Sequence, residues 1–343
     1  MPALTRHVAL QPAYHAAPAL LLLILSPVFA EMLSGSTPPR DFLNPAVLVL
    51  QVLAYGVPAV LLREWAVRQR AGWLGRVLLA LPMGFIIEGI ICKSYFSPLW
   101  PDFSLPLGYG RLFGVNWPWA LQLEAYHAVG SFLVPWAVTD ILLPRYRETP
   151  SLGKRSMLWL GALFLITGVF CSAFIPMDKA GHVYHPGVLA CLLSWGSVPL
   201  CMWLAARLKD PGPGRWNAPR GIAAFILGFG GWLLCFVVPG LVNPKEHPAG
   251  MLIGAELLFL SLNIILAWQW RLRWNPMQQF ALLYGSMSFW VLVSIMIELR
   301  LIPIPHDPRG MVLFSSFALA GLYLLGRLRL RQQCGLIHAG SSA

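Results

Sequence analysis

The chain contains a succession of apolar runs near 20 residues long, and about 20 such residues in a helix cross a hydrocarbon core of about 30 Å. Within lipid the backbone polar groups must bond to each other, so a spanning segment is a helix or a strand of a closed barrel. The runs are continuous and lack the period-two alternation of barrel strands, which indicates helices. Of the 343 residues, 57% are hydrophobic and 11% are charged, whereas a soluble protein has roughly 25% charged residues. We therefore predict an all-α, polytopic integral membrane protein.

The charged loops between the runs predict how the chain crosses the bilayer. We expect ten spans, at about residues 16–34, 44–63, 72–92, 117–143, 156–176, 187–206, 219–241, 248–269, 276–299 and 310–328. Alternate loops carry 18 and 7 of the 25 Lys and Arg residues. The positive-inside rule then places both termini in the cytoplasm of a cell-membrane protein. Because topology accounts for the net charge of +11, we expect membrane lipids as partners and no nucleic acid.

The first apolar run has a second interpretation. The stretch "ALLLLILSPVFA" ends in Val28-Phe29-Ala30, which matches the small-residue pattern of a signal-peptidase site. Cleavage there would make Glu31 the first residue. We favour an uncleaved first helix, because nine more spans follow and a single Arg precedes the run.

Three loops of the less basic set share a pattern, which suggests an internal repeat. They read "DKAGHVYHPGVL" (178–189), "NPKEHPAGML" (243–252) and "PHDPRGMVL" (305–313). Each has a His at or just before a Pro, then a Gly, then the first apolar residues of a span. We interpret His185, His247 and His306 mainly as marks of helix starts, with Pro248 in a first turn. The alternative is that the three histidines converge on one pocket mouth.

A shorter repeat on the opposite side of the membrane supports this organisation. "RWNAP" (215–219) and "RWNP" (273–276) each place an Asn where a helix N-cap is expected. Close helix packing is expected at "GFGG" (228–231) and at the GxxxG of Gly250 and Gly254. We predict a single transmembrane domain. It comprises a four-helix part (1–150) with a long outer loop (93–116), three tandem helical hairpins (151–331) and a cytoplasmic tail (332–343).

Three ionisable residues in the third and fourth spans are the catalytic candidates. Glu88 lies about one turn below the outer end of its span, and Glu124 and His127 are i,i+3 neighbours on the next. Antiparallel packing would bring all three to one level, as a carboxylate–imidazole acid–base site. The alternative is a buried polar joint between helices. A di-iron site would need a second Glu-x-x-His and two further Glu residues, so no metal is assigned.

Further polar residues near the same surface are candidates for substrate binding. Lys93 is expected to snorkel to the interface, and Glu31 lies at the membrane edge beside a Ser/Gly loop. The remaining candidates are the loop histidines His182, His185, His247 and His306. His182 and His185 form an HxxH whose use as metal ligands is a weaker alternative. The aromatic loop 93–119 is interpreted either as a lid over the site or as an interfacial aromatic belt.

The motifs that are missing limit the function. The sequence has no Walker A, GxGxxG, GxSxG, HExxH or CxxC pattern, which leaves nucleotide use, classical hydrolase chemistry and a zinc site without support. The cofactor is unknown. We predict an enzyme that modifies a lipid, an isoprenoid or a lipid-linked substrate at the extracytoplasmic leaflet by carboxylate–histidine acid–base chemistry, with a lipid-like small molecule as its partner. The alternatives are a transporter or ion-coupled permease, and a structural subunit of a membrane complex.

Overall fold

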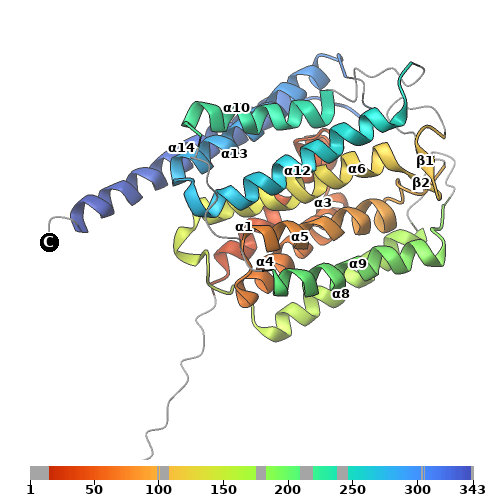
Figure 1. Ribbon diagram of the computed structural model, residues 1–343, viewed down its shortest axis with the longest axis horizontal. Coiled ribbons are helices and arrows are strands. Elements are labelled where there is room, and N and C mark those ends of the chain that lie inside the picture. Colours follow the sequence, from red (N-terminus) through yellow and green to blue (C-terminus); the bar gives the residue numbers. More distant parts are fainter. Residues whose placement is uncertain are drawn as a thin grey trace, which may run out of the picture.

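The computed structural model describes residues 15–98, 100, 108–174, 183–208, 219–237, 246–302, 304 and 306–340, with backbone alone for 266–273 and 329–340. Its long helices run roughly parallel to one another as one bundle (Figure 1). Six helices of the described part are long and apolar enough to cross a membrane, and three shorter ones are apolar. A continuous helix also runs through residues 117–142, at the place of the fourth expected span. The predicted all-α membrane fold is confirmed.

The first half of the chain supplies the buried centre of the bundle. Its helices are interrupted by π-helical segments, labelled η, in which the backbone turn is wider than in an α-helix. In chain order the elements are α1 (Ala17–Pro27), η1 (Val28–Met32), α2 (Pro39–Phe42), α3 (Pro45–Gln51), η2 (Val52–Gly56), α4 (Val57–Gln69), α5 (Trp73–Gly84), η3 (Phe85–Ile91), α6 (Trp117–Ala125), η4 (Tyr126–Leu133) and α7 (Val134–Leu142). Among the six long apolar helices, the span formed by α5 and η3 is the most deeply buried, with 78% of its most apolar stretch inside the protein.

The second half forms antiparallel helices around this centre. Its elements are the 3-10 turn η5 (Pro144–Tyr146), α8 (Lys154–Phe174), α9 (Val188–Arg207), α10 (Gly221–Trp232), η6 (Leu233–Val237), α12 (Ala249–Arg273), α13 (Pro276–Glu298) and α14 (Met311–Gly340). Many apolar side chains of α8 and α9 are exposed, as expected where a helix faces lipid. The last helix continues to Gly340, well beyond the span end expected near residue 328.

A small β-hairpin in the long loop was not predicted. Strands β1 (Arg111–Leu112) and β2 (Val115–Asn116) pair antiparallel, with Arg111 opposite Asn116. The two turn residues, Phe113 and Gly114, have φ of +53° and +78°. Positive φ at both central positions is the geometry that a two-residue hairpin turn requires.

Glycines allow one pair of helices to touch through their backbones. A Cβ on Gly228 of α10 would lie 2.1 Å from the Leu282 carbonyl oxygen, and one on Gly285 of α13 would lie 2.1 Å from the Phe225 carbonyl oxygen. The close approach predicted for "GFGG" is therefore confirmed at Gly228. Among the described residues the GxxxG prediction is wrong, because a Cβ on Gly250 or on Gly254 would meet none of their atoms within 4 Å.

The repeat motifs mark helix starts where the structure describes them. Asn275 caps α13: its side chain accepts a hydrogen bond from the Gln278 backbone N–H at 2.9 Å. In return, the Gln278 side chain accepts a hydrogen bond from the Asn275 backbone N–H. Pro248 is the N-cap of α12, so it precedes the first turn in which it was expected. The Asn of "RWNAP" lies outside the described residues.

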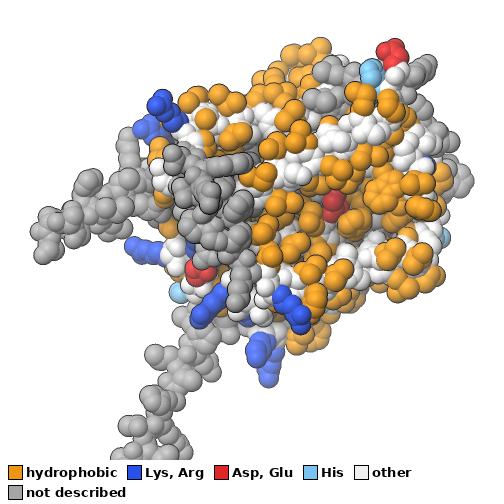
Figure 2. All heavy atoms as spheres, viewed as in Figure 1, with side chains coloured by type: hydrophobic (Ala, Val, Ile, Leu, Met, Phe, Trp, Pro, Cys, Tyr) orange, Lys and Arg blue, Asp and Glu red, His pale blue; other side chains and the backbone are white. Residues whose placement is uncertain are grey.

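Basic side chains gather at one end of the bundle, on the left of the space-filling view (Figure 2). We call this the basic end; it holds the loops that follow α4 and α7, the end of α9 and the start of α10. The asymmetry agrees with the loop charges from which the cytoplasmic side was predicted. The assignment of that end to the cytoplasm remains a prediction.

Candidate functional site

The candidate site lies where the four π-helical segments of the first half meet. Glu31 is in η1, Tyr55 in η2, Glu88 in η3, and His127 in η4. Such segments occur frequently at functional sites, because the wider turn redirects side chains. Here each of them carries a polar side chain that takes part in one buried network.

The centre of the network is a histidine with a polar partner on each ring nitrogen. His127 Nε2 lies 2.8 Å from Glu88 Oε1, and its Nδ1 lies 3.0 Å from Ser131 Oγ. The three residues are 2%, 7% and 0% exposed. Glu88 holds one side of the imidazole with a carboxylate, so the other side is presented to a hydroxyl group. A carboxylate that orients an imidazole is the arrangement that general-base sites use.

A second branch connects this histidine to the loop after η1. The Tyr55 ring stacks on the His127 ring with centroids 5.7 Å apart. Its hydroxyl donates to Glu31 Oε1 at 2.5 Å, and Thr37 donates to Glu31 Oε2 at 2.7 Å. The Gln51 amide in turn donates to Thr37 at 3.3 Å. The expected placement of Glu31 beside the Ser/Gly loop is thus seen, and its carboxylate points toward the network.

Glu124 is close to the network but has different partners from those expected. It accepts a hydrogen bond from the Tyr95 hydroxyl at 3.2 Å through Oε2, while its Oε1 is buried and has no hydrogen-bond partner among the described residues. The carboxyl group packs on the backbone of Gly84, where a Cβ would lie 2.1 Å from Oε2. Of the three catalytic candidates, Glu88 and His127 are directly bonded, and Glu124 forms a neighbouring pair with Tyr95.

The start of the long loop folds back over the site. Ser94 donates to Glu88 Oε2 at 2.5 Å and accepts from Trp119 Nε1 at 3.0 Å. Ser94 and Tyr95 are both fully buried. The β-hairpin holds this segment in place, because the Asn116 N–H donates to the Tyr95 carbonyl at 3.1 Å. The described beginning of the loop therefore covers the Glu88 and Glu124 carboxylates, whereas Phe113 at the hairpin turn is 90% exposed.

Four of the remaining candidates for substrate binding lie in the described residues. Lys93 does not snorkel: its side chain is fully buried, at a helix end with φ of +64°. His185 precedes α9 and His247 precedes α12; both helices begin at the right-hand end of the bundle in Figure 1, α9 near its lower edge and α12 near its upper edge. His306 Nδ1 lies 3.3 Å from Asp41 Oδ2. His182 lies outside the described residues.

The loop before α14 contains a separate, exposed ion pair. Arg309 donates to both carboxylate oxygens of Asp307, at 2.8 Å to Oδ2 and 3.0 Å to Oδ1 through Nε. These hydrogen bonds lower the pKa of Asp307 to about 2. The Glu298 carboxylate also bonds to this loop: it accepts the Gly310 and Val312 N–H groups, at 3.2 and 2.8 Å, at the start of α14.

Sequence reasoning missed the polar residues that complete the network. Tyr55, Ser94, Tyr95 and Ser131 supply its hydrogen bonds and its stacking contact. Ser131 alone carried a usable signal, since it is four residues after His127 and i,i+4 residues share a helix face. The other three come from other elements and are brought together by packing.

A buried charge cluster at the basic end was also missed. Glu64 Oε2 pairs with Arg68 at 2.6 Å and Glu64 Oε1 with Arg63 at 3.3 Å. The Glu64 carboxylate accepts the Ser151 and Leu152 N–H groups as well, at 2.7 and 3.2 Å. This single fully buried side chain therefore ties α4 to the loop before α8.

A second pair lies beside it. Arg76 Nη1 lies 2.8 Å from Asp140 Oδ2, and Arg147 Nε lies 3.5 Å from the same oxygen. The Arg76 guanidinium is held between the Trp73 and Trp136 rings, 4.7 and 4.5 Å from their centroids. These three charges are thus paired with one another and connect α5, α7 and the loop after α7.

A metal centre finds no support in the described residues, which include no group of three or more His, Cys, Asp or Glu that could hold an ion. A family model matches residues 20–327, nearly the whole chain, and its family is described as an uncharacterized membrane protein family. The chain belongs to this family. Comparison with curated proteins finds no match, and comparison with solved structures finds none either. Membership supports the membrane location and leaves the activity to be argued from the site.

Proposed function

We propose that this member of the family is an enzyme that modifies a membrane-borne amphiphile, with His127 transferring protons at the end of the bundle opposite the basic end. The observation that carries the proposal is the paired imidazole: Glu88 at 2.8 Å on Nε2 and Ser131 at 3.0 Å on Nδ1. When Nε2–H donates to the Glu88 carboxylate, Nδ1 is free to accept a proton. The carboxylate then stabilises the imidazolium that forms.

The surroundings of the pair favour an apolar substrate. The pair is nearly inaccessible to water, and electrostatic interactions are stronger in such a low-dielectric site. The segment around Ser94 and Tyr95 covers it, and Trp119 closes the same side. Displacing this cover would expose the carboxylates to the lipid interface. An amphiphile would reach them with its polar group while its chain stays in the membrane.

The buried-joint alternative uses the same contacts, so the test must separate stability from activity. Lipid extracts of cells with and without the gene are compared first, by mass spectrometry. We expect one lipid class to change, to be restored by the intact gene, and to remain unrestored by Glu88→Gln and His127→Ala. Glu256→Gln serves as the matched control, because Glu256 is also buried in a helix, at 1% exposure, but bonds to Cys235 at 3.4 Å outside the network.

The outcomes distinguish an acid–base site from a structural joint and from a transporter. If Glu88→Gln and His127→Ala yield folded protein with normal thermal unfolding and no restoration, the acid–base role stands. If both variants restore the lipid class, or if they lose function only in proportion to lost folded protein, the pair is a structural joint. Proton-coupled substrate flux in vesicles of purified protein, with no altered lipid, would establish the transporter alternative instead.

A further inference from the structure

A large apolar cavity lies between α7, α10, α12 and α13. Its volume is about 770 Å³, within the range of about 300–1,000 Å³ typical of ligand sites. Trp232 lines it, and the same ring packs against Tyr126 with centroids 6.0 Å apart. Tyr126 neighbours His127, so the cavity lies next to the candidate site and is separated from it by aromatic rings.

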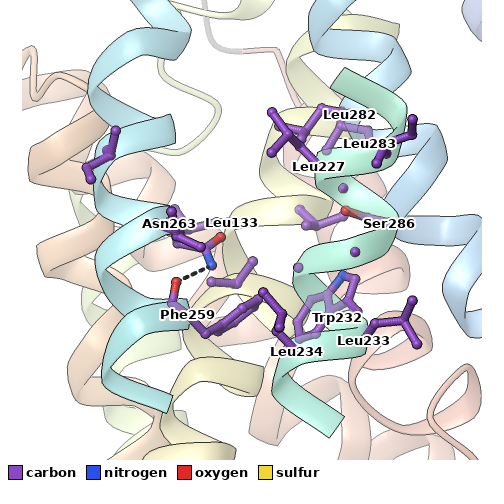
Figure 3. Close-up of a pocket in the computed structure, with 18 of the residues that line it drawn as sticks. Leu133, Leu227, Trp232, Leu233, Leu234, Phe259, Asn263, Leu282, Leu283 and Ser286 are labelled. Carbon is purple, nitrogen blue, oxygen red and sulfur yellow. Dashed lines mark hydrogen bonds between the residues drawn. The ribbon is translucent and has the colours of Figure 1, made fainter. Parts of the chain in front are cut away.

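The lining suits hydrocarbon and does not suit water. Nearly all side chains around the cavity are aliphatic or aromatic, as Figure 3 shows. Of its few polar side chains, Asn263 already donates to the Phe259 carbonyl at 2.9 Å. A buried water needs about two to four polar partners, and apolar cavities therefore stay dry.

The cavity is open on one side of the bundle. Ile226, Leu227, Leu234 and Val237 line it and are still 60%, 42%, 39% and 37% exposed. These residues belong to α10 and η6, and in Figure 3 the lining side chains of α12 face those of α10 across the opening. A lateral opening between two spanning helices faces lipid chains, which are the solvent at that depth.

One rim of the cavity lies at the basic end. Trp73 begins α5, Trp274 follows α12, and Pro219 comes just before α10; all three line the cavity. Tryptophans at helix ends are typical of the depth of lipid head groups. Arg220 is exposed at the N-cap of α10. The first N–H groups of that helix have no partner within it and favour an anion, as does the helix dipole.

We propose that this cavity binds an acyl chain of an anionic phospholipid from the leaflet at the basic end, with the phosphate at Arg220 and the first turn of α10. The apolar lining and the lateral opening select the chain. The charge at the rim selects the head group, because basic pockets between spanning helices on one side of a membrane bind anionic lipids. This site does not depend on the enzymatic role of His127.

Glycine positions allow a direct test of the chain site. Gly230 lines the cavity, and a Cβ there would meet nothing within 4 Å, so Gly230→Phe fills the space without striking the backbone. Gly161→Phe in α8 is the matched control, since its Cβ also meets nothing within 4 Å and it lies outside the cavity. The full chain is reconstituted in vesicles with phosphatidylglycerol that carries a photoactivatable group on its acyl chain.

We expect cross-links to peptides of α10 and α12, strongly reduced in Gly230→Phe and unchanged in Gly161→Phe. Leu227→Trp, at the exposed mouth, is a second blocking variant should Gly230→Phe fail to fold. Equal labelling of these peptides in the blocked and control variants overturns the proposal.

The head-group contact is tested by competition. Unlabelled phosphatidylglycerol should displace the probe better than phosphatidylcholine does, and Arg220→Gln should weaken this preference about fivefold, the effect of one basic residue near an anionic surface. Arg309→Gln is the control, because Arg309 is exposed at the opposite end of the bundle. If phosphatidylcholine competes equally well with the intact protein, the anionic part of the proposal is wrong.

Discussion

Replacing Asp140 by alanine removes the carboxylate that faces Arg76 at 2.8 Å, in a place where the two side chains are 5% and 4% exposed. Removing one partner of a buried ion pair costs about 3–5 kcal/mol, because the other charge is left without compensation. The Trp73 and Trp136 rings still face the guanidinium, and desolvated cation–π contacts contribute about 2 kcal/mol. Asp140→Ala should therefore lower the free energy of unfolding by about 3 kcal/mol, the lower end of that range.

Replacing Arg76, the other partner of the pair, should destabilise the protein less than replacing Asp140 does. Arg76→Met keeps an alkyl side chain between the two tryptophans, and Asp140 retains Arg147 at 3.5 Å. Arg147 is 32% exposed, so water screens part of that attraction. The double variant leaves neither charge unpaired and should be more stable than Asp140→Ala alone. The coupling energy of the cycle should then be about 2 kcal/mol, within the range measured for residues in direct contact.

The assay is SDS titration of purified protein in mixed micelles, followed by tryptophan fluorescence. Asp140→Asn is a control that keeps the side-chain shape without the charge. A loss below about 1 kcal/mol for Asp140→Ala, which is the size of an exposed pair, would refute the reasoning. So would a double variant whose loss equals the sum of the two single losses.

Three further outcomes follow from individual contacts. Gly84→Ala should destabilise the protein, because its methyl group displaces the Glu124 carboxyl group. The expected loss is about 1–3 kcal/mol, the cost of an unsatisfied buried group. Adding Glu124→Ala to the Gly84→Ala variant should recover most of that loss in the SDS titration. Glu64→Ala should speed limited proteolysis of the loop before α8, since this carboxylate bonds two of its N–H groups, and an unchanged rate would contradict the tether. The Asp307 carboxylate should titrate near pH 2 by NMR. Because its pKa is depressed, its pairing with Arg309 holds above about pH 4 and is lost as the pH falls through about 2. In Arg309→Gln the titration midpoint of Asp307 should return toward about 4.

The spans could be predicted because lipid imposes a simple rule on the backbone. Runs of apolar residues mark helices whatever their neighbours are, so the order of the helices follows from the sequence. The π-helical segments could not be predicted in this way, since apolar residues continue through them without a change of pattern. The hairpin at Phe113 and Gly114 was hidden for a different reason: its two-residue strands are too short to show an alternation.

The site was predictable in part, through residue types that are costly in a membrane. Glu88, Glu124 and His127 were found because a buried ionisable side chain needs a reason to be there. Their pairing was not predictable. The i,i+3 rule assumes regular α-helical turns, whereas η4 begins at Tyr126, between Glu124 and His127. The wider turn changes the direction of the His127 side chain, which hydrogen-bonds to Glu88. Glu124 instead accepts a hydrogen bond from Tyr95.

Glu64 shows where reading the loops by charge fails. It lies among arginines in a region whose positive charge was used to predict the topology, and no contact was predicted for it. Yet an acid that is fully buried beside Arg63 and Arg68 cannot be part of a charge pattern that faces water. The same arginines therefore have two roles, because Arg63 is itself buried against the loop before α8 through Ser151. A carboxylate within a basic loop is thus better treated as a candidate for a buried contact between elements, because each neighbouring basic residue can be buried with it as a partner.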